Sequence, residues 1–149
     1  TRTTSSAASD VYKRQGFRAR EKELLDELTQ LDSIVLATGG GAVLNATNRR
    51  WLAERGLVIY LPAAVELQLK RLAQDRQRPL LQHPDRAQRL RDMAAVRNPL
   101  YESIADITVP AADIRVDPMA QQVLAAIRAY QEQDHPKESN EISRSGIGP

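Results

Sequence analysis

The sequence predicts an α/β protein with a parallel sheet, because short apolar runs alternate along the chain with amphipathic stretches. The strand-like runs are 33–38, 57–61 and 107–109, and each is a continuous apolar or β-branched run, as buried parallel strands are. Helical spacing of apolar residues fills the stretches between them. Strands separated by helices favour parallel pairing with right-handed crossovers. A length of 149 residues leaves room for one domain.

The first half of the chain predicts two helices around a buried strand. Leucines recur at helical spacing through a charged stretch over roughly 17–31, which indicates the first helix. The strand at 33–38 follows it directly. A second helix is expected to begin with Asn45 or Thr47 as its cap and to stop at Gly56.

The second half repeats this alternation. A helix over about 63–75 leads into a loop that contains prolines, and a further helix is expected over 85–97. After the strand at 107–109, Asp117 as N-cap and Pro118 as first helical residue open a last helix, which continues to about Tyr130.

Both ends of the chain lack the periodicity of the middle. We expect residues 1–15 to be a non-native or disordered leader and residues 131–149, rich in charge, Ser, Gly and Pro, to be a disordered tail. The codons GAT GTG TAT AAG AGA CAG would encode residues 10–15, and they resemble the transposon end that is joined to DNA in sequencing-library preparation. The expected domain is therefore 16–130.

Composition excludes several classes of function. The formal net charge is +2 and the arginines are dispersed, whereas a nucleic-acid binder shows basic residues clustered on one face. Cysteine is absent, and His83 and His135 are too far apart to suggest a metal site. No apolar stretch approaches the about 18 residues of a membrane helix, and no export signal is present, so the cytoplasm is the default location.

Three glycines directly after the first expected strand indicate a ligand site. Gly39, Gly40 and Gly41 have no Cβ, so they can adopt positive φ and let a ligand approach the peptide N–H groups. The carboxyl end of a parallel strand is where open α/β sheets bind ligands. A plain turn is the alternative interpretation of such a cluster.

Several motifs together resemble shikimate kinase, a small P-loop kinase related to the nucleoside monophosphate kinases, over about 16–130. The motifs are Gly16-Phe17-Arg18 with Glu21, Gly39-Gly40-Gly41, Gln77-Arg78-Pro79-Leu80-Leu81, Arg97-Asn98-Pro99-Leu100-Tyr101 and Ala105-Asp106. The resemblance implies a three-layer α/β/α fold with a parallel sheet. The phosphate-binding motif G-x-x-x-x-G-K-[ST] occurs nowhere in the sequence, so the first strand and the P-loop are expected to be missing. Tyr101 and Asp106 are expected to be packing and turn residues.

The resemblance also implies a substrate site. Its residues are Arg18, Glu21, Gly39, Gly40, Gly41 and Arg97. The two arginines match those that bind the shikimate carboxylate, for which a planar guanidinium suits bidentate pairing. Glu21 lies one helical turn from Arg18 and can hold the guanidinium in place. The glycine turn lies beside the shikimate ring and near the γ-phosphate. Surface salt bridging is the alternative role for these charges.

For the nucleotide, the resemblance implies ATP and Mg²⁺ in the intact parent protein, with no protein residue assigned to the metal. The cofactor-binding residues are Arg71, Arg78, Val116, Asp117 and Pro118. Arg78 matches a lid arginine and is the expected catalytic residue, because a cation placed on the moving phosphoryl group stabilises its charge. Arg71 resembles an arginine that stacks on adenine. The other three border the adenine or simply open a helix.

The implied activity is transfer of the γ-phosphate of ATP to the 3-hydroxyl of shikimate, on the route through chorismate to aromatic amino acids. The implied partners are shikimate and ATP, without nucleic acid or membrane, and the intact parent is expected to be a monomer. Without a phosphate loop nothing enforces the geometry of transfer, so this chain is expected to be inactive as given. A non-catalytic carboxylate-binding remnant and a related small-molecule kinase such as gluconate kinase are the alternatives.

Overall fold

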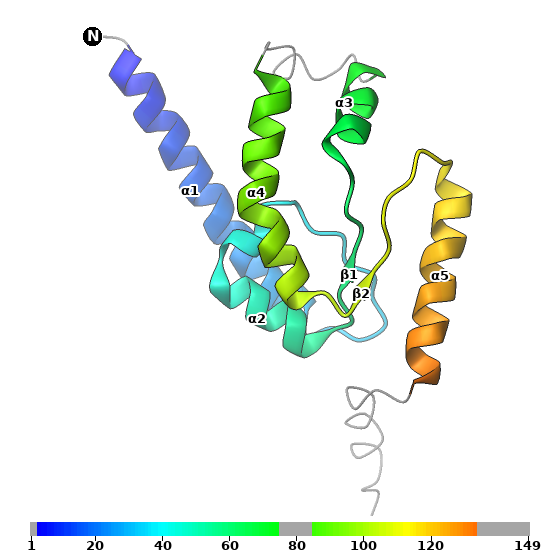
Figure 1. Ribbon diagram of the computed structural model, residues 1–149. Coiled ribbons are helices and arrows are strands. Elements are labelled where there is room, and N and C mark those ends of the chain that lie inside the picture. The colour runs from blue at the N-terminus through cyan, green and yellow to red at the C-terminus, as the bar shows by residue number, and fades with distance from the viewer. Residues whose placement is uncertain (1–2, 75–84, 134–149) are drawn as a thin grey trace, which may run out of the picture. The chain divides into compact units, whose positions relative to one another are not determined.

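The computed structural model describes residues 3–74 and 85–133 (Figure 1). The chain divides into two compact units. The first unit comprises Thr1–Val58 and His83–Asp106, and the second unit comprises Ile59–Gln82 and Ile107–Pro149. Each unit is built from residues distant in the sequence, so each depends on tertiary contacts.

The first unit opens with a long helix, α1, which spans Thr3–Leu28. It begins well before residue 17, where the sequence analysis placed its start. Residues 7–20 are exposed on every side, so burial does not select the helix there. No Gly or Pro interrupts 3–15, and a helix nucleated at its packed end can continue through such residues. The non-native origin of residues 1–15 stays a prediction.

The segment after α1 is extended but is not a strand. Ile34 is 43% exposed and Val35 is 102% exposed, so the prediction of a buried strand at 33–38 is wrong. A strand exists only where a neighbour supplies the other half of the hydrogen-bond ladder, and no described strand pairs with this segment. Ser33, in the turn that follows α1, has a φ of 58°.

Helix α2, Ala46–Arg55, begins where the sequence predicted it. The side chain of Asn45 accepts hydrogen bonds from the backbone N–H groups of Thr47 at 2.8 Å and Asn48 at 3.2 Å. These bonds satisfy two of the donors that a helix start leaves open, so the cap prediction is confirmed for Asn45. Gly56 is the C-cap, in an extended conformation.

The buried centre of the first unit is the 3-10 helix η1, Ala42–Leu44, which follows the three glycines. Two side chains of α2 bind its carbonyl groups. Asn48, only 2% exposed, donates to the Ala42 oxygen at 3.0 Å, and Arg49 donates to the Val43 oxygen at 2.6 Å. This pairing fixes the segment directly after the glycines against α2.

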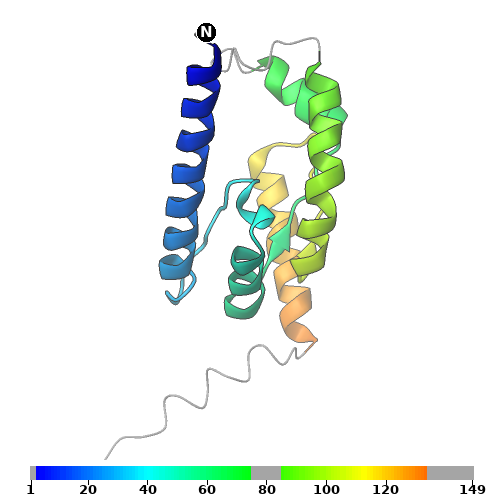
Figure 2. The same cartoon turned by 90° about the vertical axis from the view of Figure 1, so that its left-hand side faces the viewer.

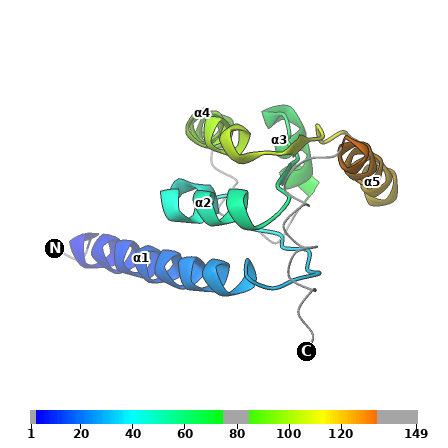
Figure 3. The same cartoon turned by 90° about the horizontal axis from the view of Figure 1, so that it is seen from below.

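Helix α4, Arg86–Ile104, completes the first unit. It runs past Arg97, where the sequence analysis ended it, and contains Pro99. A proline inside a helix removes one N–H donor, but the turn beyond it contributes the half-buried Tyr101 and Ile104, whose packing favours continuation. Figures 2 and 3 show α2 between α1 and α4.

The second unit holds the sheet. Strands β1, Ile59–Tyr60, and β2, Ile107–Thr108, pair in parallel with Ile59 opposite Ile107. Parallel pairing and the position of both strands are confirmed, although each is shorter than predicted. The ladder continues past β1 through a 2.9 Å bond from the Val109 N–H to the Tyr60 oxygen. Ile107 and Val109 are buried.

Two helices belong to the second unit: α3, Val65–Gln74, and α5, Val116–Glu132. The predicted cap Asp117 is wrong, because α5 starts at Val116 with Arg115 as N-cap and without a capping side-chain bond. Pro118 is accommodated because the first turn of a helix does not need its N–H groups. Asp117 still suits the positive end of the helix dipole.

Candidate functional site

Two charged side chains of α1 meet one turn apart. Arg18 Nη1 and Glu21 Oε1 lie 2.7 Å apart, and their side chains are 44% and 13% exposed. The three-residue spacing puts both side chains on one face of the helix. Glu21 is therefore placed to orient the Arg18 guanidinium, as the sequence analysis expected of the pair.

The glycines lie directly against this pair. A Cβ added to Gly41 would be 2.5 Å from Arg18 Cζ, which is an overlap, and a Cβ on Gly39 would be 3.5 Å from Glu21 Oε2. The bare backbone of this bend is thus in contact with the charged face of α1. We call residues 39–41 the glycine bend.

Arg97 reaches the same bend from α4. A Cβ on Gly40 would lie 3.3 Å from Arg97 Nη1 and 3.0 Å from the hydroxyl oxygen of Tyr101. Arg97 and Tyr101 are four residues apart and share one helix face. The structure therefore brings Arg18, Arg97 and the glycine bend together, although the two arginines are 79 positions apart in the sequence.

The conformation of the bend differs from the expectation. None of its glycines has a positive φ, so they serve close approach rather than a left-handed turn. Each carbonyl accepts one hydrogen bond: Gly39 from the Ala42 N–H at 3.1 Å, Gly41 from the Leu44 N–H at 3.1 Å, and Gly40 from the Tyr101 hydroxyl at 2.5 Å. Within the described part of the chain, the three glycine N–H groups donate no backbone hydrogen bond.

This arrangement suits a small carboxylate. Two guanidinium groups and one carboxylate, from Arg18, Arg97 and Glu21, leave one net positive charge around a bend without side chains. Guanidinium forks bind carboxylates bidentately, and backbone N–H groups can meet hydroxyl oxygens at short range. We call Arg18, Glu21, the glycine bend and Arg97 the carboxylate pocket.

An apolar groove of about 360 Å³ borders the pocket on the α1 side. Glu21 and Gly39 lie on its wall, and the rest of the lining is mostly leucine and other apolar side chains of α1 and the extended segment after it.

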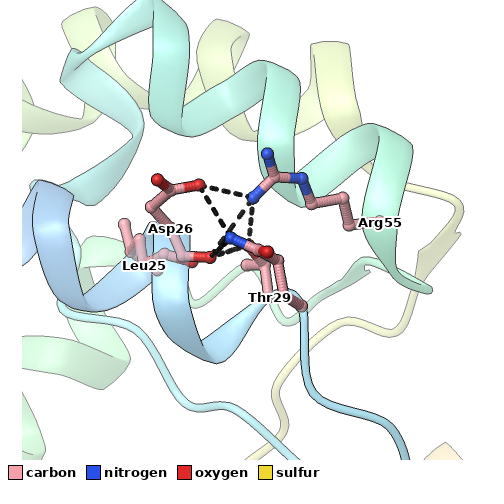
Figure 4. A network of polar contacts seen from close by, with 5 residues as sticks. Leu25, Asp26, Thr29 and Arg55 are labelled. Atoms are coloured by element: carbon pink, nitrogen blue, oxygen red, sulfur yellow. Dashed lines mark hydrogen bonds and ion pairs between the residues drawn. The ribbon is translucent and has the colours of Figure 1, made fainter.

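A polar network fixes the end of the helix that carries Arg18 (Figure 4). From α2, Arg55 Nη1 lies 2.8 Å from Asp26 Oδ1 and donates to Thr29 Oγ1 at 3.0 Å. Thr29 in turn donates to the Leu25 carbonyl at 2.6 Å. The Arg55 guanidinium also lies 5.0 Å from the centre of the Trp51 ring. These contacts attach the C-terminal end of α1 to α2 and thereby limit where Arg18 can lie.

The expected nucleotide residues lie in the second unit or outside the described residues. Arg71 donates from Nη2 to the Ala112 carbonyl at 3.1 Å, so it holds the loop before α5. Val116, at 82% exposure, and the exposed Asp117 and Pro118 are in the first turn of α5. Arg78, the expected catalytic residue, lies outside the described residues.

One ionisable group in this loop is perturbed. Lys70 forms an ion pair with Asp113, and the hydrogen bond and charge of Lys70 hold the pKa of the Asp113 carboxyl below its usual value. Among residues 3–74 and 85–133, no three acidic, histidine or cysteine side chains gather to hold a metal ion. No helix of the same ranges is long and apolar enough to cross a membrane.

Sequence reasoning missed the part played by Tyr101. The sequence predicts a packing or turn residue at this position, beyond a helix that is predicted to end at about Arg97. Had α4 been continued through Pro99, the four-residue spacing would have put Tyr101 on the Arg97 face. Asp106, the other residue of that expectation, accepts from the Val58 N–H at 2.8 Å and donates its own N–H to the Val58 oxygen at 2.9 Å.

Comparisons with known proteins find similar sequences and a similar fold. The family model of shikimate kinase matches residues 1–128. The chain is 51% identical to a shikimate kinase of Pasteurella multocida and 48% identical to one of Haemophilus influenzae, each over 79% of the chain and 68% or 66% of the relative. A solved shikimate kinase from Acinetobacter baumannii, in complex with shikimate, has a TM-score of 0.70 and 46% identity over 76% of the chain and 64% of that protein. The likeness shows the α/β kinase fold, and the chain spans about two thirds of the length of these relatives.

Proposed function

Because the chain belongs to the shikimate kinase family, we propose that it binds shikimate in the carboxylate pocket. The observation that carries this proposal is that Arg18 and Arg97 both lie against the glycine bend. In the whole protein, we propose that this site presents shikimate for ATP-dependent phosphorylation of its 3-hydroxyl group. The relatives that match are shikimate kinases, which are transferases.

The residues of the carboxylate pocket have different roles in binding. Arg18 and Arg97 pair with the carboxylate, and Glu21 keeps the Arg18 fork in one orientation. The absence of side chains on Gly40 and Gly41 lets the guanidinium groups of Arg97 and Arg18 lie close to the backbone of the bend. This set recognises an anionic, hydroxylated ring better than a neutral sugar, because an uncharged ligand offers the guanidinium groups no carboxylate.

The described residues do not form a binding site for Mg·ATP. The sequence contains no G-x-x-x-x-G-K-[ST] motif, whose backbone and lysine cradle the phosphates in P-loop kinases, and the described part of the chain has no cluster of metal ligands. We therefore propose that ATP and Mg²⁺ serve the whole protein, with adenine near Arg71 and Val116–Pro118 and the transferred phosphate near Arg78. This chain by itself is expected to transfer no phosphate.

This chain should still bind shikimate although it transfers no phosphate, because every residue of the carboxylate pocket lies in the first unit.

The activity of the whole protein belongs to the cytoplasmic route to chorismate and aromatic amino acids. The whole protein is proposed to act as a monomer on small-molecule partners alone.

Calorimetric titration of shikimate into this chain tests the proposal. We expect measurable binding that weakens by about 10- to 100-fold in Arg97→Ala and in Arg18→Ala, because each removes a charge-assisted bidentate contact. Arg50→Ala, on an exposed position of α2, is the control and should bind as the unaltered chain does. Equal binding by all four proteins, or tighter binding of gluconate than of shikimate, would contradict the proposal.

A second measurement separates binding from transfer. ADP release with shikimate is compared for this chain and for a chain in which a phosphate-loop segment of the family is fused ahead of Gly16. We expect release only from the fused chain. Rapid release from the chain as it stands would refute the proposed requirement for that loop.

A further inference from the structure

We propose that Tyr101 is a positioning residue of the carboxylate pocket: its hydroxyl holds the glycine bend at the place where Arg97 meets it. This inference rests on the proposed function, because the residue acts on shikimate through other groups. The Tyr101 hydroxyl donates to the Gly40 oxygen at 2.5 Å, across 61 residues of sequence.

The bend needs such a contact because it has no side chains with which to pack. The carbonyl groups of Gly39 and Gly41 accept bonds from N–H groups three residues further along, which shape the bend but attach it to nothing distant. The Gly40 carbonyl is bound from α4 instead. The Tyr101 hydroxyl is therefore the hydrogen bond that attaches the centre of the bend to the helix of Arg97.

The attachment sets the spacing between the two guanidinium groups. Arg97 and the Tyr101 hydroxyl contact the same glycine, while Arg18 contacts the next one, Gly41. A shift of the bend along α4 would change how far Arg97 lies from Arg18. Bidentate recognition of one carboxylate tolerates misplacement of only about 0.5 Å, so a loose bend would weaken binding even with both arginines present.

Tyr101→Phe tests the idea because it removes the hydroxyl and keeps the ring. We expect the Kd for shikimate to rise by about fivefold to tenfold, the loss of one neutral hydrogen bond that orders the site. Tyr12→Phe is the matched control: Tyr12 is 79% exposed on α1, and its variant should bind as the unaltered chain does.

A second readout needs no ligand and separates positioning from general destabilisation. Backbone amide resonances of the glycine bend, followed by NMR in the free chain, should shift and broaden in Tyr101→Phe while the midpoint of thermal unfolding changes little. Tyr12→Phe should leave these resonances where they are. A hydroxyl that contributes only to overall stability would lower the midpoint without a selective change at the bend.

The outcomes distinguish this inference from the proposed function. If the unaltered chain binds shikimate and Tyr101→Phe binds equally well, the positioning role is overturned. If the unaltered chain does not bind shikimate, the proposed function fails, and the amide resonances decide about Tyr101: a selective change at the bend supports its role there, and unchanged resonances overturn it.

Discussion

The guanidinium group of Arg18 occupies the space that a side chain on Gly41 would need. The backbone of Gly41, with φ −86° and ψ −5°, is one that alanine adopts without strain. The conflict therefore lies between the new methyl group and the guanidinium end of a side chain that is 44% exposed and paired with Glu21. Glycine is required at this position by the site rather than by the backbone.

Alanine substitutions along the glycine bend should weaken shikimate binding in a graded order. Gly39→Ala makes only an ordinary contact and should change the Kd by less than about twofold, while Gly40→Ala meets Arg97 and Tyr101 closely and should cost more. Gly41→Ala should displace Arg18 and raise the Kd by about tenfold or more, because a charge-assisted contact is lost. Calorimetry measures the three values.

The control for this series is Gly16→Ala on α1, where an added Cβ meets nothing within 4 Å. It should stabilise the chain by about 0.5–1 kcal/mol, since glycine is a poor helix residue, and leave the Kd unchanged. Loss of stability in Gly41→Ala as large as its loss of affinity would contradict the site-based explanation.

Replacing Arg55 should loosen the end of α1. Arg55→Ala removes the contacts with Asp26 and Thr29 and the stacking on Trp51, and we expect a loss of about 1 kcal/mol in the free energy of unfolding by urea. Arg50→Ala, on the same helix and exposed, should change it by less than about 0.5 kcal/mol. Equal effects of the two substitutions would show that the network in Figure 4 contributes no stability.

Replacing Ser33 by glycine should raise the free energy of unfolding. Its φ of 58° lies in the left-handed region, which costs about 1 kcal/mol for a residue with a Cβ. Ser33→Gly should raise the free energy of unfolding by about 0.5–1 kcal/mol relative to Ser33→Ala, which keeps the Cβ. A higher stability of the alanine variant in urea unfolding would contradict this conformation of the turn.

Acid should weaken the Lys70–Asp113 pair. The pKa of Asp113 is lowered in the folded chain, so its contribution to stability is present above the unfolded pKa of about 3.9 and is lost as the pH falls through the folded pKa. Asp113→Asn should therefore flatten the fall of the unfolding midpoint below about pH 4. Lys70→Gln should flatten it equally, and the double variant no further; independent effects of the two changes would rule out the pair as the cause.

The local sequence pattern was sufficient to predict elements that are stabilised by neighbouring residues. Asn45 caps α2 through its own neighbours. The apolar runs at 57–61 and 107–109 contain β1 and β2 because each strand has the other as its ladder partner. The local pattern was insufficient at 33–38, because the apolar run looks like a strand but a ladder needs a partner segment. The predicted end of α4 at Arg97 is too early. Pro99 lies inside the helix, because a proline ends an isolated helix more reliably than a packed one.

What the sequence determined by itself is the α/β alternation and the meeting of Arg18 and Glu21 on one turn, because helical periodicity places residues that are three positions apart on one face. Only the tertiary structure decided that Arg97 and Tyr101 arrive at the same glycine bend. Contacts between residues so far apart are set by how α1, α2 and α4 pack around η1, and no local spacing encodes that packing.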